Sequence, residues 1–430
     1  MHHPIHILLR GAGFVNRGAE AMLRTCQVEL ARRIPGAVFH VILAREEAEP
    51  AMGAGLVWHA PGQFRGQRFG PRFGRWATVV AASRTTPHLA RIDRFCRTTA
   101  LDVVAIGQVD AVVDISGYAY GDSWSAPFGY RQTAAWSEYA RLTGIPYILL
   151  PQAWGPFQDP MVSSYTRQIC TAASRVFARD EESLGYLKHL LQGTPVDLLL
   201  APDIAFRFNG AHSRVGAAVL SREGIDMQHG PLIGLAPNMR VYERAEGMGA
   251  ANRYVQVLIA VARHCISRLG ACVVLIPHEI STPGSPHRDD RFLCGLVKTA
   301  LAGQPDCIAL MDHHRTEVLK AVLGHLDLLI GSRFHSLVLA LSSGVPVVAA
   351  GWSHKYRELL KPFGLADLVL EHDELDTPEA LIDKIEQGWQ RREETCQQIA
   401  QVLPGIRAKV DALFDDVAEL IQEQASARQA

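Results

Sequence analysis

The sequence predicts an α/β protein built from two doubly wound domains of parallel strands and helices. Three observations support this prediction. The chain has 430 residues, which exceeds one ordinary core, because a domain typically holds about 100 to 200 residues. Short apolar runs alternate with longer amphipathic segments, as in parallel βα units. After a polar, glycine-containing stretch at 208–230, a second series of such runs begins.

Each apolar run predicts one strand. In the first series the expected strands are 5–9, 39–43, 111–115, 147–150, 175–178 and 196–200. In the second series they are 232–236, 272–276, 307–311, 326–330 and 345–349.

These strands define the expected domains. We expect a Rossmann-like domain over 1–207 on the acceptor side, a linker over 208–230, a second Rossmann-like domain over 231–400 on the donor side, and a C-terminal helix over 401–430. Two such domains facing a cleft form a glycosyltransferase-B-like fold. Ligands in such folds bind where the carboxyl ends of the strands converge.

Composition narrows the function classes. Hydrophobic residues make up 48% of the chain and charged residues 20%, as in an ordinary globular protein. The net charge of −1 gives no general affinity for polyanions, so no nucleic-acid partner is expected. No run of about 18 apolar residues predicts a membrane span, and a cytoplasmic location is expected.

A metal site is not expected either. The eight cysteines contain no CxxC pair, which is poor spacing for zinc and for a disulfide framework. His278 and Glu279 follow a predicted strand, and His313 and His314 are adjacent, but none of them has the spacing of a zinc motif.

One segment has an unusual charge. Residues 60–100 contain eight arginines, no lysine and one acid, Asp93, which gives a local charge of 8 − 1 = +7. In its first part, aromatic residues lie between the arginines. This pattern predicts peripheral contact with anionic lipid headgroups, at the inner face of the membrane, or with a lipid-diphosphate acceptor. The alternative is a solvated helical face.

The strongest local signal is the stretch 326–355, LDLLIGSRFHSLVLALSSGVPVVAAGWSHK. An apolar strand ends at Gly331, Ser332 is a favourable helix cap, and a helix is expected over 333–342. Arg333 and His335 would then lie in the first turn of a helix at the carboxyl end of a strand. Such a helix start binds anions, arginine adds a planar fork for phosphate or carboxylate, and histidine exchanges protons near neutral pH.

Several phrases together resemble the polysaccharide pyruvyl transferase family. GSRFHS with the downstream GVPVVAAGWSHK resembles the family's signature in the C-terminal half. Other similar phrases follow in the same order: GAGFVNRGAEAML, DISGYAYGD, PQAWGPF, ARDEES and APDIAF. The resemblance covers residues 5 to about 365.

The resemblance implies a transferase that moves a pyruvyl group from phosphoenolpyruvate to a sugar acceptor or a lipid-linked glycan in the biosynthesis of cell-surface polysaccharides. Phosphoenolpyruvate would be a co-substrate, and no cofactor or metal is expected. The resemblance makes His335 and Arg333 the candidate catalytic residues. The candidate donor-binding residues are Arg240, Arg333, Ser332 and Lys355.

Polar residues after the predicted strands of the first domain are candidates for the acceptor site. They are Asn16, Glu20, Asp114, Tyr118, Asp122, Gln152 and Trp154. The alternative for each is a structural role in a tight turn or loop.

Two other function classes stay open. A glycosyltransferase that uses a nucleotide sugar has the same architecture, and Arg333 would suit its diphosphate. A glycan-binding or assembly protein without catalysis would keep the fold alone. The presence of both Arg333 and His335 argues against the second alternative.

Overall fold

The computed structural model describes residues 4–61, 109–122, 127–281, 289–351, 353–371, 374 and 377–429. The arginine-rich segment expected to contact a membrane or a lipid-linked acceptor therefore lies outside the described residues, apart from Ala60 and Pro61. In the described part of the chain, no helix is long and apolar enough to cross a membrane.

The contacts of the chain divide it into two compact units. Unit 1 contains residues 1–14, 22–204 and 409–430, and unit 2 contains residues 15–21 and 205–408. Each unit is centred on a parallel sheet, as the sequence predicts.

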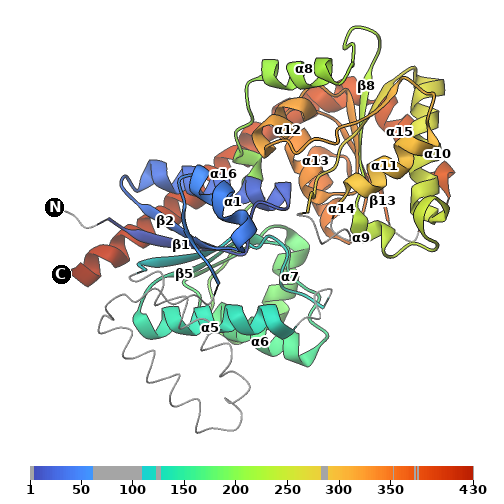
Figure 1. Ribbon diagram of the computed structural model, residues 1–430. Coiled ribbons are helices and arrows are strands. Elements are labelled where there is room, and N and C mark those ends of the chain that lie inside the picture. The colour runs from blue at the N-terminus through green and yellow to red at the C-terminus, as the bar shows by residue number, and fades with distance from the viewer. Residues whose placement is uncertain are drawn as a thin grey trace. The chain divides into compact units, whose positions relative to one another are not determined.

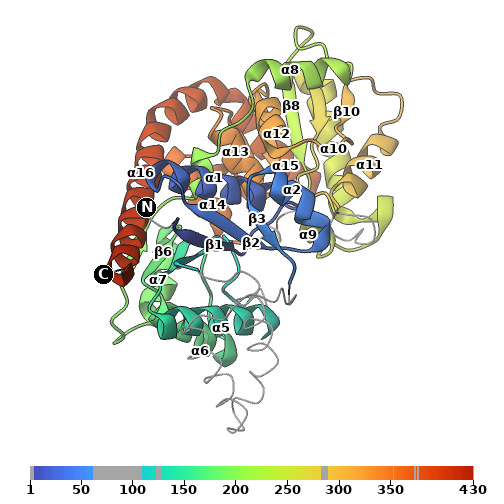
Figure 2. The same ribbon diagram turned by 60° about the vertical axis from the view of Figure 1, so that its left-hand side comes forward.

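Unit 1 has a sheet with the strand order β3-β2-β1-β4-β5-β6-β7 among the described residues. Helices α5 (Pro127–Thr143) and α6 (Pro160–Ala172) cover one face, and α1 (Arg17–Arg33) lies on the other (Figures 1 and 2). Helix α7 (Glu181–Leu190) packs against β6 and β7. The strands are β1 (His6–Arg10), β2 (Val38–Ile42), β3 (Val57–His59), β4 (Ala111–Asp114), β5 (Tyr147–Gln152), β6 (Arg175–Ala178) and β7 (Leu198–Leu200).

Unit 2 has a sheet with the described strand order β10-β9-β8-β11-β12-β13. Its strands are β8 (Leu232–Ala236), β9 (Cys272–Leu275), β10 (Cys307–Ala309), β11 (Leu328–Gly331), β12 (Val347–Ala350) and β13 (Val369–Leu370). Its main helices are α8 (Ser213–Arg222), α9 (Met239–Tyr242), α10 (Arg253–Leu269), α11 (Arg291–Ala300), α12 (Thr316–Leu323), α13 (Phe334–Leu341), α14 (Lys355–Leu360) and α15 (Pro378–Gln390).

Local sequence explains where these helices begin. Asp159 and Asp180 accept hydrogen bonds from the first backbone N–H groups of α6 and α7. Asn252 does the same for α10, which ends at Gly270 in the left-handed conformation. Short polar caps and a terminal glycine satisfy the unpaired groups at helix ends, so these boundaries follow directly from residue type.

The order of the strands reverses once in each sheet. In unit 1 the chain adds β2 and β3 on one side of β1 and β4 to β7 on the other. In unit 2 it adds β9 and β10 on one side of β8 and β11 to β13 on the other. Loops at the carboxyl ends of the two strands that flank such a reversal diverge, and ligands commonly bind there.

The structure differs from the expectation in several places. Strands β3 and β13 were not predicted from the sequence. The expected linker 208–230 contains helix α8, which packs on α12, and unit 2 begins at Ala205. The last helix, α16, is longer than predicted, Arg392–Gln429. These differences arise because short edge strands and a short amphipathic helix leave weak sequence patterns.

Candidate functional site

The carboxyl end of β11 places Arg333 at the start of α13. Arg333 is the N-cap residue of this helix, and no side chain caps it, so the expected role of Ser332 as the cap is wrong. The Arg333 side chain is buried and its guanidinium lies between two carboxylates. Nε and Nη2 donate to Asp290 at 3.0 and 2.6 Å, and Nη1 donates to Glu279 at 2.5 Å.

Asp290 holds this cluster together through several hydrogen bonds. Its carboxylate is fully buried and also accepts hydrogen bonds from the backbone N–H groups of Met239, His278 and Glu279. Burial raises the pKa of Asp290, and Arg333 opposes that shift. Burial alone would lower the pKa of Arg333, but Asp290 and Glu279 reverse the effect and raise it, so the guanidinium stays charged.

The first turn of α1 belongs to the same cluster. Asn16 caps α1 by accepting from the N–H groups of Gly18 and Ala19, and its side chain donates to Glu279 at 3.4 Å. Glu20 is buried and pairs with Arg17 at 3.0 Å. Two residues assigned from sequence to the acceptor side, Asn16 and Glu20, therefore lie in unit 2 beside the expected donor site.

Two histidines complete the cluster. His335 is half-buried in the first turn of α13, and a Cβ atom on Gly18 would overlap its ring, so the helix start of α1 packs directly on this imidazole. His278 is buried, and neither of its ring nitrogens has a hydrogen-bond partner among the residues that the structure describes. Burial, followed by the positive charge that His335, Arg333 and Arg17 can carry, lowers the pKa of His278 well below its ordinary value.

The other residues expected to bind the donor occupy different positions. Ser332 is built into the core, where its hydroxyl accepts from Tyr254 and its carbonyl accepts from Asn238 and Tyr356. Lys355 is buried at the start of α14, with Nζ 5.5 Å from the centre of the Tyr356 ring. Arg240 is partly exposed in α9 and pairs with Glu243 at 2.8 Å.

In unit 1 the structure buries three residues expected to bind the acceptor. Asp114 is fully buried and pairs with Arg10 at 2.7 Å. It also accepts hydrogen bonds from Tyr120 at 3.0 Å and Gln152 at 3.3 Å. Gln152 and Trp154 are fully buried as well. These contacts give Asp114 and Gln152 a role in holding loops of unit 1 together.

The remaining two residues of that group are half-buried. Asp122 accepts hydrogen bonds from the backbone N–H groups of Gln158 and Asp159, at 2.6 and 3.1 Å. It thus ties the segment after β4 to the segment after β5. Tyr118 lies in the same loop and keeps part of its surface exposed.

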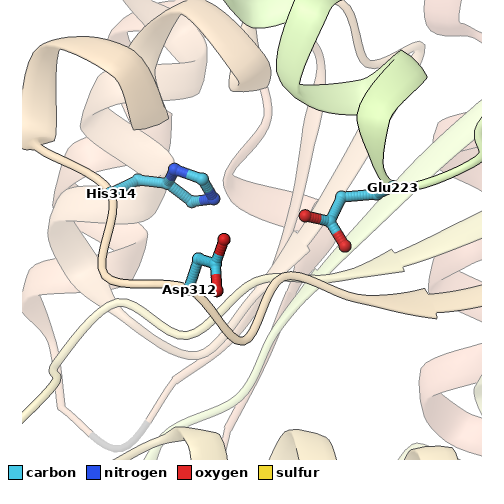
Figure 3. A group of neighbouring side chains, drawn as sticks. All are labelled: Glu223, Asp312 and His314. Atoms are coloured by element: carbon cyan, nitrogen blue, oxygen red, sulfur yellow. The ribbon is translucent and has the colours of Figure 1, made fainter.

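A group of possible metal ligands lies in unit 2, away from Arg333. Glu223, Asp312 and His314 point toward one another (Figure 3), with one ligand atom from each within 4.8 Å of the others. Arg222 already lies 3.7 Å from Asp312, and the Asp312 side chain is 70% exposed. Exposed carboxylates often gather without an ion, so the expectation of a protein without a metal stays a prediction.

Sequence reasoning missed the roles of Arg17 and Asp290. Both are far from GSRFHS along the chain. Arg17 lies within the phrase GAGFVNRGAEAML, where only Asn16 and Glu20 are candidate site residues, and Asp290 lies in none of the quoted phrases. The available signal was position: Asp290 precedes a helix and Arg17 follows a glycine loop. Only the fold brings them to the carboxyl ends of β9 and β11.

Comparison with known proteins agrees with this arrangement. The family model of polysaccharide pyruvyl transferases matches residues 16–354. The chain belongs to the polysaccharide pyruvyl transferase family. The match begins at the cap of α1 and continues beyond α13. It therefore includes the α1 residues and the α13 residues that meet around Arg333. The family predicted from the sequence is therefore confirmed.

One curated relative and several solved structures extend the comparison. The chain is 21% identical to the amylovoran biosynthesis protein AmsJ of Erwinia amylovora over 320 residues, which cover 73% of this chain and 74% of AmsJ. It is similar to Anabaena HepE in complex with UDP and glucose, with a TM-score of 0.54, 13% identity, and coverage of 96% of this chain and 100% of HepE.

It is also similar to a trehalose 6-phosphate synthase of Burkholderia multivorans, with a TM-score of 0.56, 11% identity and full coverage of both chains. At such low identity these structures show the fold alone. They confirm two Rossmann-like domains of the glycosyltransferase-B class for this family member.

Proposed function

We propose that the protein transfers a pyruvyl group from phosphoenolpyruvate to two hydroxyls of a sugar acceptor in the biosynthesis of a cell-surface glycan. The observation that carries the proposal is the position of Arg333 and His335. Within the family match they lie at the carboxyl end of β11, where the strand order of unit 2 reverses. The relation to an amylovoran biosynthesis protein supports the glycan context.

The chemistry defines what the site must supply. Two acceptor oxygens form bonds to C2 of phosphoenolpyruvate, the bond from C2 to the phosphate oxygen breaks, and C3 gains a proton to become a methyl group. One hydroxyl proton balances the proton gained by C3, and the other leaves with phosphate. The reaction therefore needs a group that moves protons and fixed positive charge for the departing phosphate.

We assign these tasks to residues of unit 2. His335 would move the proton, because it is the half-buried imidazole in the first turn of α13. Arg333 would hold the donor's charge together with Lys355 and Arg240. The positive charges of the buried cluster are already engaged, because Arg17 pairs with Glu20 and Arg333 pairs with both Asp290 and Glu279. Donor binding would therefore loosen one carboxylate, and Glu279 is the better candidate because Asp290 holds Arg333 through two bonds.

Donor choice can be tested before the acceptor is known. Phosphoenolpyruvate should raise the midpoint of thermal unfolding, because a ligand that binds only the folded state stabilises it. UDP-glucose is the matched control, since a similar fold binds UDP and glucose in HepE. Stabilisation by UDP-glucose and not by phosphoenolpyruvate would favour the nucleotide-sugar alternative.

Turnover is tested with glycan fractions as acceptors. We expect phosphate release that requires both phosphoenolpyruvate and acceptor. In deuterium oxide the product methyl group should carry solvent deuterium, as measured by mass spectrometry. Donor binding without release from any acceptor would favour the non-catalytic alternative.

A further inference from the structure

A separate cavity in unit 2 lies away from the Arg333 cluster. Its volume is about 360 Å³. The walls come from the segment that enters unit 2 before α8, from α12, from the end of α13 and from α16. This volume lies in the range of small-molecule sites, which is roughly 300 to 1,000 Å³.

The cavity is cationic. Lys320 and Arg407 both line it, and none of its described lining residues is acidic. In the described part of the chain, both side chains donate only to neutral backbone carbonyls. Lys320 Nζ lies 2.6 Å from the Phe208 carbonyl oxygen, and Arg407 Nη2 lies 2.8 Å from that of Ser342. Carbonyls satisfy hydrogen bonds but do not neutralise two charges.

The positive charge of the cavity, without an acidic partner among its described lining residues, affects the pKa of Lys320. Lys320 is buried, and burial, followed by repulsion from Arg407, lowers its pKa to about 7. Burial and Arg207 also lower the pKa of Arg407. Buried charges are normally paired with an opposite charge. An anion in the cavity would supply that missing partner.

The unused donors match a phosphate group. Lys320 donates one of its N–H groups to Phe208, and Arg407 donates through Nε and Nη2, so each keeps further N–H groups. Ser342 and Ser343 also line the cavity, but their hydroxyls already donate to the Leu339 carbonyl, so the free donors come from Lys320 and Arg407. A guanidinium fork beside an ammonium group suits a dianion with several oxygens.

We propose that this cavity binds a phosphate dianion, either inorganic phosphate or a phosphate monoester, at a site separate from the Arg333 cluster. Inorganic phosphate would be the product of the proposed reaction, whereas a monoester would be an independent ligand. The cavity lies where the chain enters unit 2 after Ile204 and a few residues before it leaves at Lys409. A ligand there would contact the segment that follows the first crossing and the residue Arg407, which precedes the second.

The test uses isothermal titration of the full chain with inorganic phosphate and, separately, with glucose 6-phosphate. Lys320→Met and Arg407→Gln should each weaken binding about tenfold or more, because each removes a charged donor. Lys298→Met is the matched control, since Lys298 also donates to a backbone carbonyl but lies outside the cavity. Turnover in the proposed reaction should be unchanged in all three variants, because none of the three residues contacts Arg333 or His335, and this separates the proposal from the proposed activity.

The two arms identify the ligand source. Tighter binding of glucose 6-phosphate that depends on Lys320 assigns a monoester, and equal or tighter binding of phosphate assigns the inorganic ion. Absence of saturable binding of either probe overturns the proposal. Binding that survives in both Lys320→Met and Arg407→Gln also overturns it, provided that circular dichroism shows both variants folded.

Discussion

In each unit an arginine at the carboxyl end of a strand pairs with a carboxylate, but the two pairs have different roles. In unit 1, Arg10 at the end of β1 pairs with Asp114 at the end of β4, on the two strands that flank the reversal. In unit 2, Arg333 follows β11 and pairs with Asp290 and Glu279.

The surroundings explain the difference. Around Asp114, side chains of Tyr120, Tyr147 and Gln152 use the carboxylate oxygens, and all of them are fully buried. Around Arg333, the half-buried His335 and the partly exposed Arg240 lie at the carboxyl ends of neighbouring strands. Similar topology therefore yields a structural pair in unit 1 and a candidate active site in unit 2.

The largest expected effect tests the structural pair. Asp114→Asn should lower the free energy of unfolding by about 3 to 5 kcal/mol, because it leaves the Arg10 charge buried without its partner. Urea denaturation measures this loss. Glu138→Gln is the control, since it breaks a largely exposed pair with Arg141 and should cost about 1 kcal/mol or less. A loss as small as the control's would show that the Arg10–Asp114 pair does not stabilise unit 1.

The next effect concerns catalysis in unit 2. His335→Ala should reduce turnover about 100-fold or more, the usual scale of general acid–base assistance, while phosphoenolpyruvate still binds. Steady-state phosphate release and a donor titration measure the two quantities. His229→Ala, which replaces an exposed histidine of the same unit, should leave both unchanged. Near-normal turnover in folded His335→Ala would leave His335 with a structural role alone.

A third prediction uses pH to probe the buried imidazole of the site. The pKa of His278 lies well below its ordinary value of 6.5, so the unfolded chain takes up a proton near that pH that the folded chain does not. Stability should therefore fall as the pH drops below 6.5, by up to about 1.4 kcal/mol per pH unit. His278→Gln should remove this contribution.

The measurement is the difference between wild type and His278→Gln in the free energy of unfolding at several pH values, so that other groups cancel. The difference should be constant above pH 6.5 and change below it. Parallel stability curves over the whole range would contradict a neutral buried His278.

The smallest effect tests the contact between α1 and His335. Gly18→Ala should slow turnover about tenfold, because the added methyl group must displace the imidazole that lies against it. Alanine favours helix more than glycine does, so the loss would not come from a weaker α1. Gly53→Ala, in helix α2 (Ala48–Gly53) with open space around it, is the control and should have normal turnover.

Much of the fold could be predicted because its signals are local. Buried runs such as 232–236 are apolar throughout, and their limits match β8. The arginine and histidine of GSRFHS could be placed at a helix start because a strand and a helix pattern meet there. The short strand β13 could not be predicted, because two residues are too few to show a hydrophobic period.

The site was harder to predict because its partners are distant in sequence. Asp114 and Gln152 end strands β4 and β5, where ligand-binding residues of such folds commonly lie, but their burial depends on which side chains pack over them. The carboxylates on Arg333 come from the ends of other segments, and no spacing connects Asp290 to residue 333. The sequence pattern predicts the strand or helix from which a side chain projects, whereas the residues packed around that side chain determine its contacts.

Residues 15–21 belong to unit 2 by their contacts, although they precede most of unit 1 in sequence. An exchange of N-terminal halves between two members of the family, with a junction near residue 204, would therefore carry a piece of the second unit with it. Asn16, Arg17 and Glu20 would then meet unfamiliar partners at Glu279, His278 and Thr316. Recombination at this junction should yield functional hybrids only when the two parents carry matching residues in the loop before α1 and in the segment after β9.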